Sequence, residues 1–148
     1  MLDPRGDTET LIDFVIEKPV KSVLELGTGS GAIAITLACE WKEVHVTAID
    51  ISEEALSLAK INAEKFNVQN KIDFFKSDWF EAVKGSFDLI ISNPPYIGLI
   101  EKDEIATEVI KYDPEIALFA GRDGLDAYKK IIPNLEKYLN PDGFVVLE

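Results

Sequence analysis

The residues best suited to chemistry follow the apolar run from Phe87 to Ile91, in the segment Ser92-Asn93-Pro94-Pro95-Tyr96. Neither proline has a backbone N–H and each restricts the residue before it, so a buried strand must stop here. Asn93 then offers a side-chain amide and Pro94 a carbonyl at the carboxyl end of a strand, where open α/β sheets bind ligands. A Pro-rich turn without a ligand is an equal interpretation of this motif when it is taken alone.

A second candidate site is the glycine loop Gly27-Thr28-Gly29-Ser30-Gly31, which directly follows the apolar run Val23 to Leu26. Glycines lack Cβ atoms, so a ligand can approach the backbone, and the start of the next helix is expected to offer unpaired N–H groups. With Ala32 the loop fits both G-x-G-x-G and the dinucleotide pattern G-x-G-x-x-A. The glycines alone therefore allow S-adenosylmethionine, a dinucleotide, or only a tight turn.

Acidic residues follow the next two predicted strands. Asp50 comes after the strand Val44 to Ile49, and because Ser52 can cap the following helix, Asp50 is predicted to bind two ribose hydroxyls. Asp78 and Trp79 follow the third strand, where an acid can meet an adenine amino group and an indole can form an apolar wall. A role for Trp79 as an anchor of the core is equally open.

The elements that must position these residues alternate between strands and helices. Ser52 is expected to begin an amphipathic helix with Ala55, Leu56, Ala59, Ala63 and Phe66 on one stripe. The other expected elements are helices at Thr8 to Glu17, Ala32 to Trp41 and Leu125 to Leu139, the last kinked at Pro133, and strands at Ile72 to Phe75 and Phe144 to Leu147. The segment Ile97 to Arg122 is predicted to form a lip with a short helix near Glu104 to Ile110. This order predicts an α/β fold with a doubly wound, mostly parallel sheet.

Composition limits the possible functions. The 148 residues, 47% of them hydrophobic, predict one globular domain, and the net charge of -12 disfavours binding along a nucleic-acid backbone. No apolar run is long enough for a membrane span and the N-terminus has no signal-peptide core, so a cytoplasmic protein is expected. Cys39 is expected to be a buried small hydrophobe, and with His45 as the one histidine no metal site is predicted.

Taken together, these motifs resemble the class I S-adenosylmethionine-dependent methyltransferases that methylate amino groups. The sequence is most similar to the release factor glutamine methyltransferase family, through Pro4-Arg5-Gly6-Asp7-Thr8-Glu9, the segment Tyr112 to Leu118 and the segment Gly121 to Leu125. The motif NPPY is shared with adenine and guanine methyltransferases, whereas these flanking segments are more specific. The resemblance covers nearly the whole chain.

The resemblance implies a Rossmann-like methyltransferase sheet, an S-adenosylmethionine cofactor with S-adenosylhomocysteine as product, and a peptide chain release factor with a Gly-Gly-Gln loop as substrate. In that family, the Asn93 oxygen and the Pro94 carbonyl would accept the two hydrogens of the substrate amide, and Tyr96 would pack on the flat amide. Pro95 completes the substrate-binding motif, and Asn93 would also border the cofactor.

The chain also departs from the family. Gly6 stands where the family usually has proline, which would loosen this loop without removing Arg5 or Glu9. By the resemblance, residues 1–148 are expected to be a partial catalytic domain, without the N-terminal helical domain and with the sheet truncated after the fifth strand.

Three alternatives remain open at this stage. A nucleic-acid amino-group methyltransferase would use NPPY to hold a flipped base, although the acidity disfavours it. A nicotinamide-dependent oxidoreductase fits the glycines and Asp50 but leaves NPPY unexplained. A cofactor-binding remnant without activity is the third.

Overall fold

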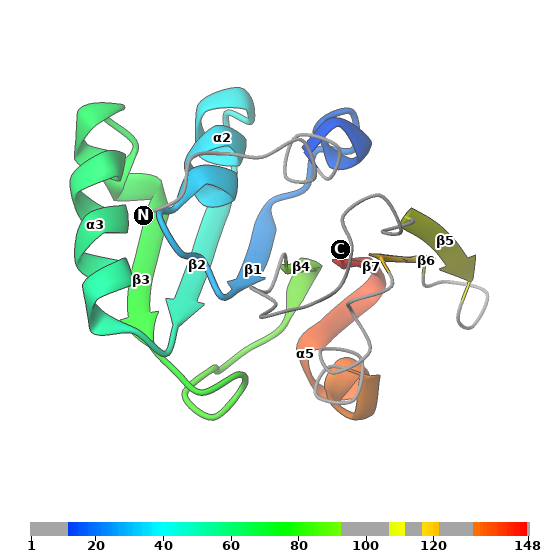
Figure 1. Ribbon diagram of the computed structural model, residues 1–148. Helices are drawn as coiled ribbons and strands as arrows, with labels where there is room; N and C mark the ends of the chain where they lie inside the picture. Colours follow the sequence, from blue (N-terminus) through cyan, green and yellow to red (C-terminus); the bar gives the residue numbers. More distant parts are fainter. Residues whose placement is uncertain (1–11, 93–106, 112–116, 122–131, 148) are drawn as a thin grey trace.

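The computed structural model describes residues 12–92, 107–111, 117–121 and 132–147, and these form one seven-stranded sheet (Figure 1). Its strand order is β3-β2-β1-β4-β7-β6-β5. The strands are β1 (Ser22–Leu26), β2 (His45–Asp50), β3 (Ile72–Lys76), β4 (Phe87–Ser92), β5 (Thr107–Lys111), β6 (Ala117–Gly121) and β7 (Leu139–Leu147).

All pairings from β3 to β6 are parallel, and β5 pairs antiparallel with β6. The central strands are apolar because both of their faces are covered: Val23 and Leu24 in β1 and Leu89 to Ile91 in β4 are fully buried. The predicted doubly wound, mostly parallel α/β sheet is thus confirmed.

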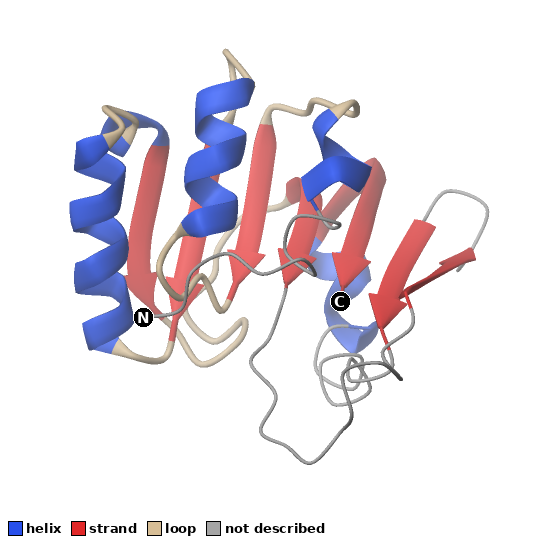
Figure 2. Ribbon diagram, turned by 45° about the horizontal axis from the view of Figure 1, so that its top comes forward, coloured by secondary structure: helices blue, strands red, loops and turns tan. Residues whose placement is uncertain are grey.

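Helices cover the two faces of the sheet unequally (Figure 2). On one face, α2 (Ala32–Glu40) and α3 (Glu53–Lys65) pack with the helical residues 12–16 over one apolar cluster. On the other face, α5 (Leu135–Tyr138) and the loop 77–86 cover a second cluster, in which the rings of Phe80 and Tyr138 stack at 4.5 Å. The second face is therefore closed largely by a loop.

Helix α3 begins as predicted, with the Ser52 Oγ accepting a hydrogen bond from the Ala55 N–H at 3.1 Å. Its inner stripe buries Ala55, Leu56, Ala59 and Ala63. The assignment of Phe66 to this stripe was wrong. Phe66 is the C-cap residue, its backbone is no longer helical, and its side chain is 60% exposed. The apolar stripe of the helix therefore ends one turn earlier than the sequence pattern indicated.

The chain beyond β4 differs from expectation. The helix predicted near Glu104 to Ile110 was wrong, because Thr107–Lys111 is strand β5. Strands β6 and β5 extend the sheet beyond the five parallel strands that were expected. Of the predicted helix Leu125 to Leu139, the described part is a 3-10 turn at Ile132–Asn134, which contains Pro133, followed by α5.

Strand β7 begins at Leu139, five residues before its predicted start, and its register with β4 shifts between Phe87 and Leu89. The extra residues of β7 approach β4 closely. A Cβ on Gly143 would lie 2.8 Å from the Asn140 carbonyl oxygen and 2.9 Å from that of Asp88, so only glycine fits there. The Asn140 side-chain N–H also donates to the Asp88 carboxylate at 2.9 Å, which lowers the pKa of Asp88.

Two further properties concern the surface. Cys39 is exposed near the end of α2, so the prediction that it is buried was wrong. Among the described residues, β3 has a neighbouring strand on one side only. Two of its side chains contact side chains of neighbouring elements: Asp73 Oδ2 lies 2.9 Å from His45 Nε2, and Lys76 Nζ lies 3.5 Å from Glu53 Oε2. No helix in the described ranges is long and apolar enough to cross a membrane.

Candidate functional site

The carboxyl ends of the four strands β3, β2, β1 and β4 meet at one edge of the sheet. Leu26, the last residue of β1, is in register with Ile49 in β2 and with Ser92 in β4. The Ser77 N–H donates to the Asp50 carbonyl oxygen at 3.1 Å, which joins the ends of β3 and β2. The glycine loop, Asp50 and Asp78-Trp79 therefore follow neighbouring strands at this edge.

The glycine loop joins β1 to α2 in a conformation that needs glycine. Its three glycines have φ between 58° and 88°, the left-handed region that a side chain disfavours. Gly31 is also packed tightly, since a Cβ there would lie 3.1 Å from the Ala59 Cβ of α3. The loop is tied to α3 a second time, because the Asn62 side chain donates to the Ser30 carbonyl oxygen at 2.9 Å.

Asp50 connects this loop to the start of α3. Its Oδ2 accepts a hydrogen bond from the Gly29 N–H at 2.8 Å, and its Oδ1 accepts one from the Ser52 N–H at 2.9 Å. Each carboxylate oxygen has a further lone pair. The half-buried Asp50 can therefore hold the loop in place and still accept hydrogen bonds from a ligand.

The N–H groups of the loop itself are mostly used within the protein, whereas the expectation of unpaired donors concerns the start of α2, where the N-cap residue Gly31 makes no side-chain cap hydrogen bond. Gly27 and Thr28 both donate to the Ile49 carbonyl oxygen, at 2.9 and 2.8 Å. Gly31 donates to the Thr28 carbonyl oxygen at 2.9 Å, and Gly29 donates to Asp50 as described above. A ligand would therefore meet the first N–H groups of α2 rather than those of the loop.

Beneath the loop lies Glu25, a residue that the sequence analysis did not select. Glu25 is 1% exposed, and its Oε1 accepts a hydrogen bond from the Thr28 hydroxyl at 2.7 Å. Burial raises the pKa of Glu25 to about 8, although the hydrogen bonds from Thr28 and from the Ala34 N–H oppose the rise. The signal was present in the sequence, as a single acid inside an apolar strand, two residues before the glycine loop.

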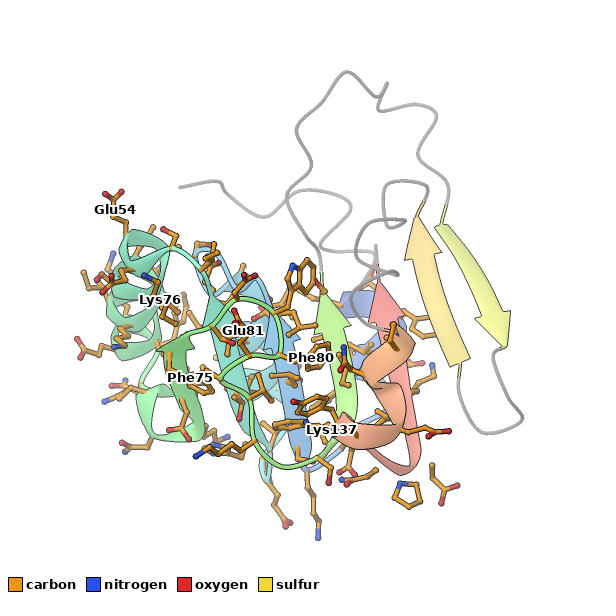
Figure 3. All side chains as sticks on the ribbon, turned by 90° about the horizontal axis from the view of Figure 1, so that it is seen from below. Glu54, Phe75, Lys76, Phe80, Glu81 and Lys137 are labelled. Carbon is orange, nitrogen blue, oxygen red and sulfur yellow. The ribbon has the colours of Figure 1, made fainter. Side chains whose placement is uncertain are left out.

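Asp78 and Trp79 border a cavity of about 480 Å³ between the loop after β3 and helix α5. Figure 3 shows Phe80 and Glu81 on the loop and Lys137 on the helix. Trp79 has a positive φ of 53° and is half-buried against the second apolar cluster, so it is both part of the core and part of a cavity wall. Asp78 is exposed at the same place.

Two more residues at this edge were missed. Ile51, directly after Asp50, is 61% exposed and presents an aliphatic side chain beside the polar groups of this edge. Ser92 is fully buried, and its hydroxyl donates to the Leu26 carbonyl oxygen at 2.8 Å, which fixes the end of β4 against the start of the loop. The motif residues Asn93, Pro94, Pro95 and Tyr96, which follow Ser92, lie outside the described residues, as do Pro4 to Glu9, Tyr112 to Ile116 and Arg122 to Leu125. Among the described residues, no group of three or more His, Cys, Asp or Glu side chains could hold a metal ion.

A parallel α/β sheet with a glycine loop after its first strand and an acid after its second defines a nucleoside-cofactor-binding domain. Comparison with known proteins narrows this class. Residues 5–121 match the model of the methyltransferase small domain family, and the chain belongs to that family.

Curated relatives agree with this assignment and confirm the resemblance found in the sequence. The chain is 45% identical over 147 residues to a release factor glutamine methyltransferase of Cereibacter sphaeroides, covering 99% of this chain and 53% of that protein. It is 46% identical over 171 residues to a bifunctional methyltransferase of Rickettsia typhi, covering 100% of this chain and 33% of that protein. The chain thus spans a third to about half of the length of these relatives.

Solved structures show the same fold. A ribosomal protein L11 methylase from Lactobacillus delbrueckii subsp. bulgaricus superimposes with a TM-score of 0.66 at 28% identity, over 99% of this chain and 62% of that one. An RNA methyltransferase from Salinibacter ruber, in complex with S-adenosyl-L-homocysteine, gives a TM-score of 0.65 over 95% of this chain and 72% of that one. Its identity to this chain is 17%, so this second likeness concerns the fold alone.

Proposed function

We propose that this domain transfers a methyl group from S-adenosylmethionine to the side-chain amide nitrogen of a glutamine, in the Gly-Gly-Gln loop of a peptide chain release factor. The observation that carries the proposal is the 45% identity, over nearly the whole chain, to an enzyme named for this reaction. A release factor substrate would put the reaction in the cytoplasm, where translation is terminated.

The family match supports S-adenosylmethionine over a nicotinamide dinucleotide, because residues 5–121 match a methyltransferase domain while the glycine loop and Asp50 fit either cofactor. Asp50 bonds to Gly29, so its carboxylate lies beside the loop. The cationic ammonium and sulfonium of S-adenosylmethionine would be attracted to this acid. These residues therefore fit S-adenosylmethionine, which supplies the methyl group when bound.

The remaining residues at the strand ends can be assigned to the two halves of the nucleoside. In our proposal Asp50 accepts hydrogen bonds from the ribose hydroxyls, as its free lone pairs allow. Asp78 bonds the adenine amino group, while Trp79 and the exposed Ile51 form apolar walls for the ring.

The substrate amide requires positioning, because its nitrogen lone pair is delocalised into the carbonyl. In our proposal the Asn93 side-chain oxygen and the Pro94 carbonyl accept the two amide hydrogens, Tyr96 packs on the amide plane, and Pro95 holds the turn. These contacts favour a more tetrahedral nitrogen and aim its lone pair at the methyl carbon, a gain from fixed orientation and dipoles.

The bonds and charges then balance without a strong base. The new bond joins the amide nitrogen to the methyl carbon, the bond from that carbon to sulfur breaks, and the sulfur leaves as the neutral thioether S-adenosylhomocysteine. The nitrogen is briefly cationic and loses its extra proton to water after the transfer.

The decisive experiment measures transfer of labelled methyl from S-adenosylmethionine to two acceptors, using the full-length protein. A release factor with an intact Gly-Gly-Gln loop should become labelled, and the same factor with Gln replaced by Ala should not. Duplex DNA containing adenine serves as the second acceptor.

Three outcomes would contradict the proposal. Labelling of DNA but not of the release factor would assign the domain to the nucleic-acid amino-group methyltransferases. Binding of S-adenosylmethionine without labelling of either acceptor would indicate an inactive cofactor-binding remnant. Binding of a nicotinamide dinucleotide in its place would overturn the cofactor assignment.

A further inference from the structure

The peptide group between Ser30 and Gly31 is the last one before the first residue of helix α2, and hydrogen bonds hold it at both ends. Its carbonyl oxygen accepts from the Asn62 side-chain N–H of α3 at 2.9 Å, and its N–H donates to the Thr28 carbonyl oxygen at 2.9 Å. Gly31 has a φ of 88°, and because a glycine can change its φ at little cost, this peptide would otherwise be able to rotate. The two bonds together fix the direction in which the chain enters α2.

Helix α3 supports the loop at this point with two neighbouring side chains. Ala59 and Asn62 are three residues apart in α3 and therefore lie on the same side of it. Ala59 is fully buried, and a Cβ on Gly31 would lie 3.1 Å from its Cβ, so the loop and the helix approach closely here. The half-buried Asn62 supplies the donor, without which the Ser30 carbonyl oxygen would have no partner among the described residues.

The first N–H groups of α2 are the donors that this arrangement directs. Ala32 and Ile33 begin the helix, where a backbone N–H has no acceptor one turn earlier. In the described part of the chain no group accepts from either N–H, whereas the Ala34 N–H bonds the buried Glu25. The N-terminus of a helix attracts negative charge, so a carboxylate is the group that the start of α2 would bind in a ligand.

We propose that Asn62 is a positioning residue for the cofactor. By holding the Ser30 carbonyl group, it aims the first N–H groups of α2 at the carboxylate in the methionine part of S-adenosylmethionine. The inference rests on the proposed cofactor. Asn62 acts through the loop and not by touching the cofactor, so its loss should weaken the binding of the amino-acid end and leave the adenosine end unaffected.

The test compares two ligands that differ only at the amino-acid end. S-adenosylhomocysteine and 5′-methylthioadenosine are both neutral thioethers of adenosine, and only the first carries the amino-acid group. Calorimetric titration of the full-length protein measures both affinities. Asn62→Ala should weaken the binding of S-adenosylhomocysteine by about three- to tenfold, the scale of one hydrogen bond, and that of methylthioadenosine by less than about twofold.

Lys71→Met is the matched control, because Lys71 holds the opposite end of α2 in the same way. Its Nζ donates to the Ala38 and Trp41 carbonyl oxygens at 2.8 and 3.1 Å, and Lys71 is half-buried like Asn62. Both variants should be less stable than the wild type in urea, since each loses a side-chain bond to the backbone. Lys71→Met should nevertheless bind both ligands as the wild type does.

If Asn62→Ala does not fold, nuclear magnetic resonance of the wild type provides a second measurement. The backbone amide resonances of Ala32 and Ile33 should shift when S-adenosylhomocysteine is added. They should stay in place when methylthioadenosine is added, because this ligand has no carboxylate.

Equal affinities of the wild type and Asn62→Ala for S-adenosylhomocysteine would overturn the inference and leave the proposed function intact. An equal loss of affinity for both ligands would do the same, as would a similar loss in Lys71→Met, because the effect would then be one of general stability. Amide resonances of Ala32 and Ile33 that do not distinguish the two ligands would also overturn it. A wild type that binds neither S-adenosylmethionine nor S-adenosylhomocysteine would instead refute the proposed cofactor, and the inference with it.

Discussion

Asp50 uses both of its carboxylate oxygens within the protein, and each of them fixes a segment next to the proposed ribose site. Oδ2 binds Gly29 of the glycine loop, and Oδ1 binds Ser52 at the start of α3. An acid at this position therefore organises the site in addition to any contact with ligand. Asparagine would keep one acceptor but lose the charge and place an N–H₂ against a donor.

We expect Asp50→Ala to weaken S-adenosylmethionine binding by about 1 to 3 kcal/mol, the cost of leaving hydroxyls or donors unpaired. Asp50→Asn should fall between the wild type and Asp50→Ala. Calorimetric titration measures the affinities, and Asp73→Ala is the control, since Asp73 is an exposed acid near the opposite end of the strands. An unchanged affinity in a folded Asp50→Ala protein would place Asp50 outside the site.

A second prediction concerns Asn93 and the binding of the substrate amide. If it orients the substrate amide, Asn93→Ala should keep the fold and most of the cofactor affinity but lose at least about a hundredfold in methyl transfer, the scale for one positioned polar group. The measurement is labelled methyl transfer to the release factor by the full-length protein.

Asn93→Asp is the informative companion, because both residues serve turns by similar local hydrogen bonds. If Asn93 only shapes a turn, Asp should preserve activity. Near-normal transfer by Asn93→Ala would remove Asn93 from the mechanism.

At the scale of elements, the first turn of α3 is capped by the side chain of Ser52. Ser52→Ala should lower the free energy of unfolding by about 1 kcal/mol, because the bond from the Ser52 Oγ to the Ala55 N–H is lost. Ser57→Ala, on the exposed surface of the same helix, should leave stability unchanged or raise it slightly. Urea denaturation of both variants checks this, and equal stabilities would show that the cap contributes nothing.

The strands up to Ser92 could be predicted to within a residue or two, because their apolar runs are bounded by glycines, acids and prolines. The predicted starts of α2 and α3 were confirmed for the same reason. Within the candidate site, the sequence indicated the glycine loop, Asp50 and Asp78-Trp79, and the structure brings them to one edge of the sheet.

The features that the sequence did not predict depend on contacts between segments that are far apart in the chain. The segment Thr107–Lys111 carries Thr, Val and Ile, which favour strands, but it becomes a strand by pairing with Ala117–Gly121, a partner that no local pattern reveals. Glu25 was passed over because an acid is normally exposed, and only the sheet shows that both neighbours of β1 bury it. The internal bonds of the loop likewise depend on the position of Ile49 in the next strand.

At the scale of the whole molecule, the buried acid makes stability depend on pH. The unfolded chain releases the Glu25 proton near its ordinary value of 4.5, and the folded chain holds it up to about pH 8. Between these values the folded state binds more protons, so the free energy of unfolding falls as pH rises, by at most about 1.4 kcal/mol per pH unit.

Glu25→Gln removes this dependence while keeping the shape of the side chain. We expect its stability relative to the wild type to increase steadily from pH 5 to pH 8, as measured by urea denaturation in the absence of cofactor. Glu64→Gln should show no such trend. A stability difference between Glu25→Gln and the wild type that stays constant over this range would mean that Glu25 ionises normally in the folded protein.

The position of β3 at the end of the strand order affects how the molecule behaves at high concentration. In the part of the chain that the structure describes, no strand pairs with the outer side of β3. Such an edge presents unpaired N–H and C=O groups that can pair with another sheet and start aggregation. Asp73 and Lys76 put opposite charges on this strand, and His45 and Glu53 hold them in place from the neighbouring elements. Such charges hinder the approach of a second strand, because burying them would cost their hydration. Colloidal stability at this edge therefore depends on the hydration of exposed charged side chains that contribute little to folding.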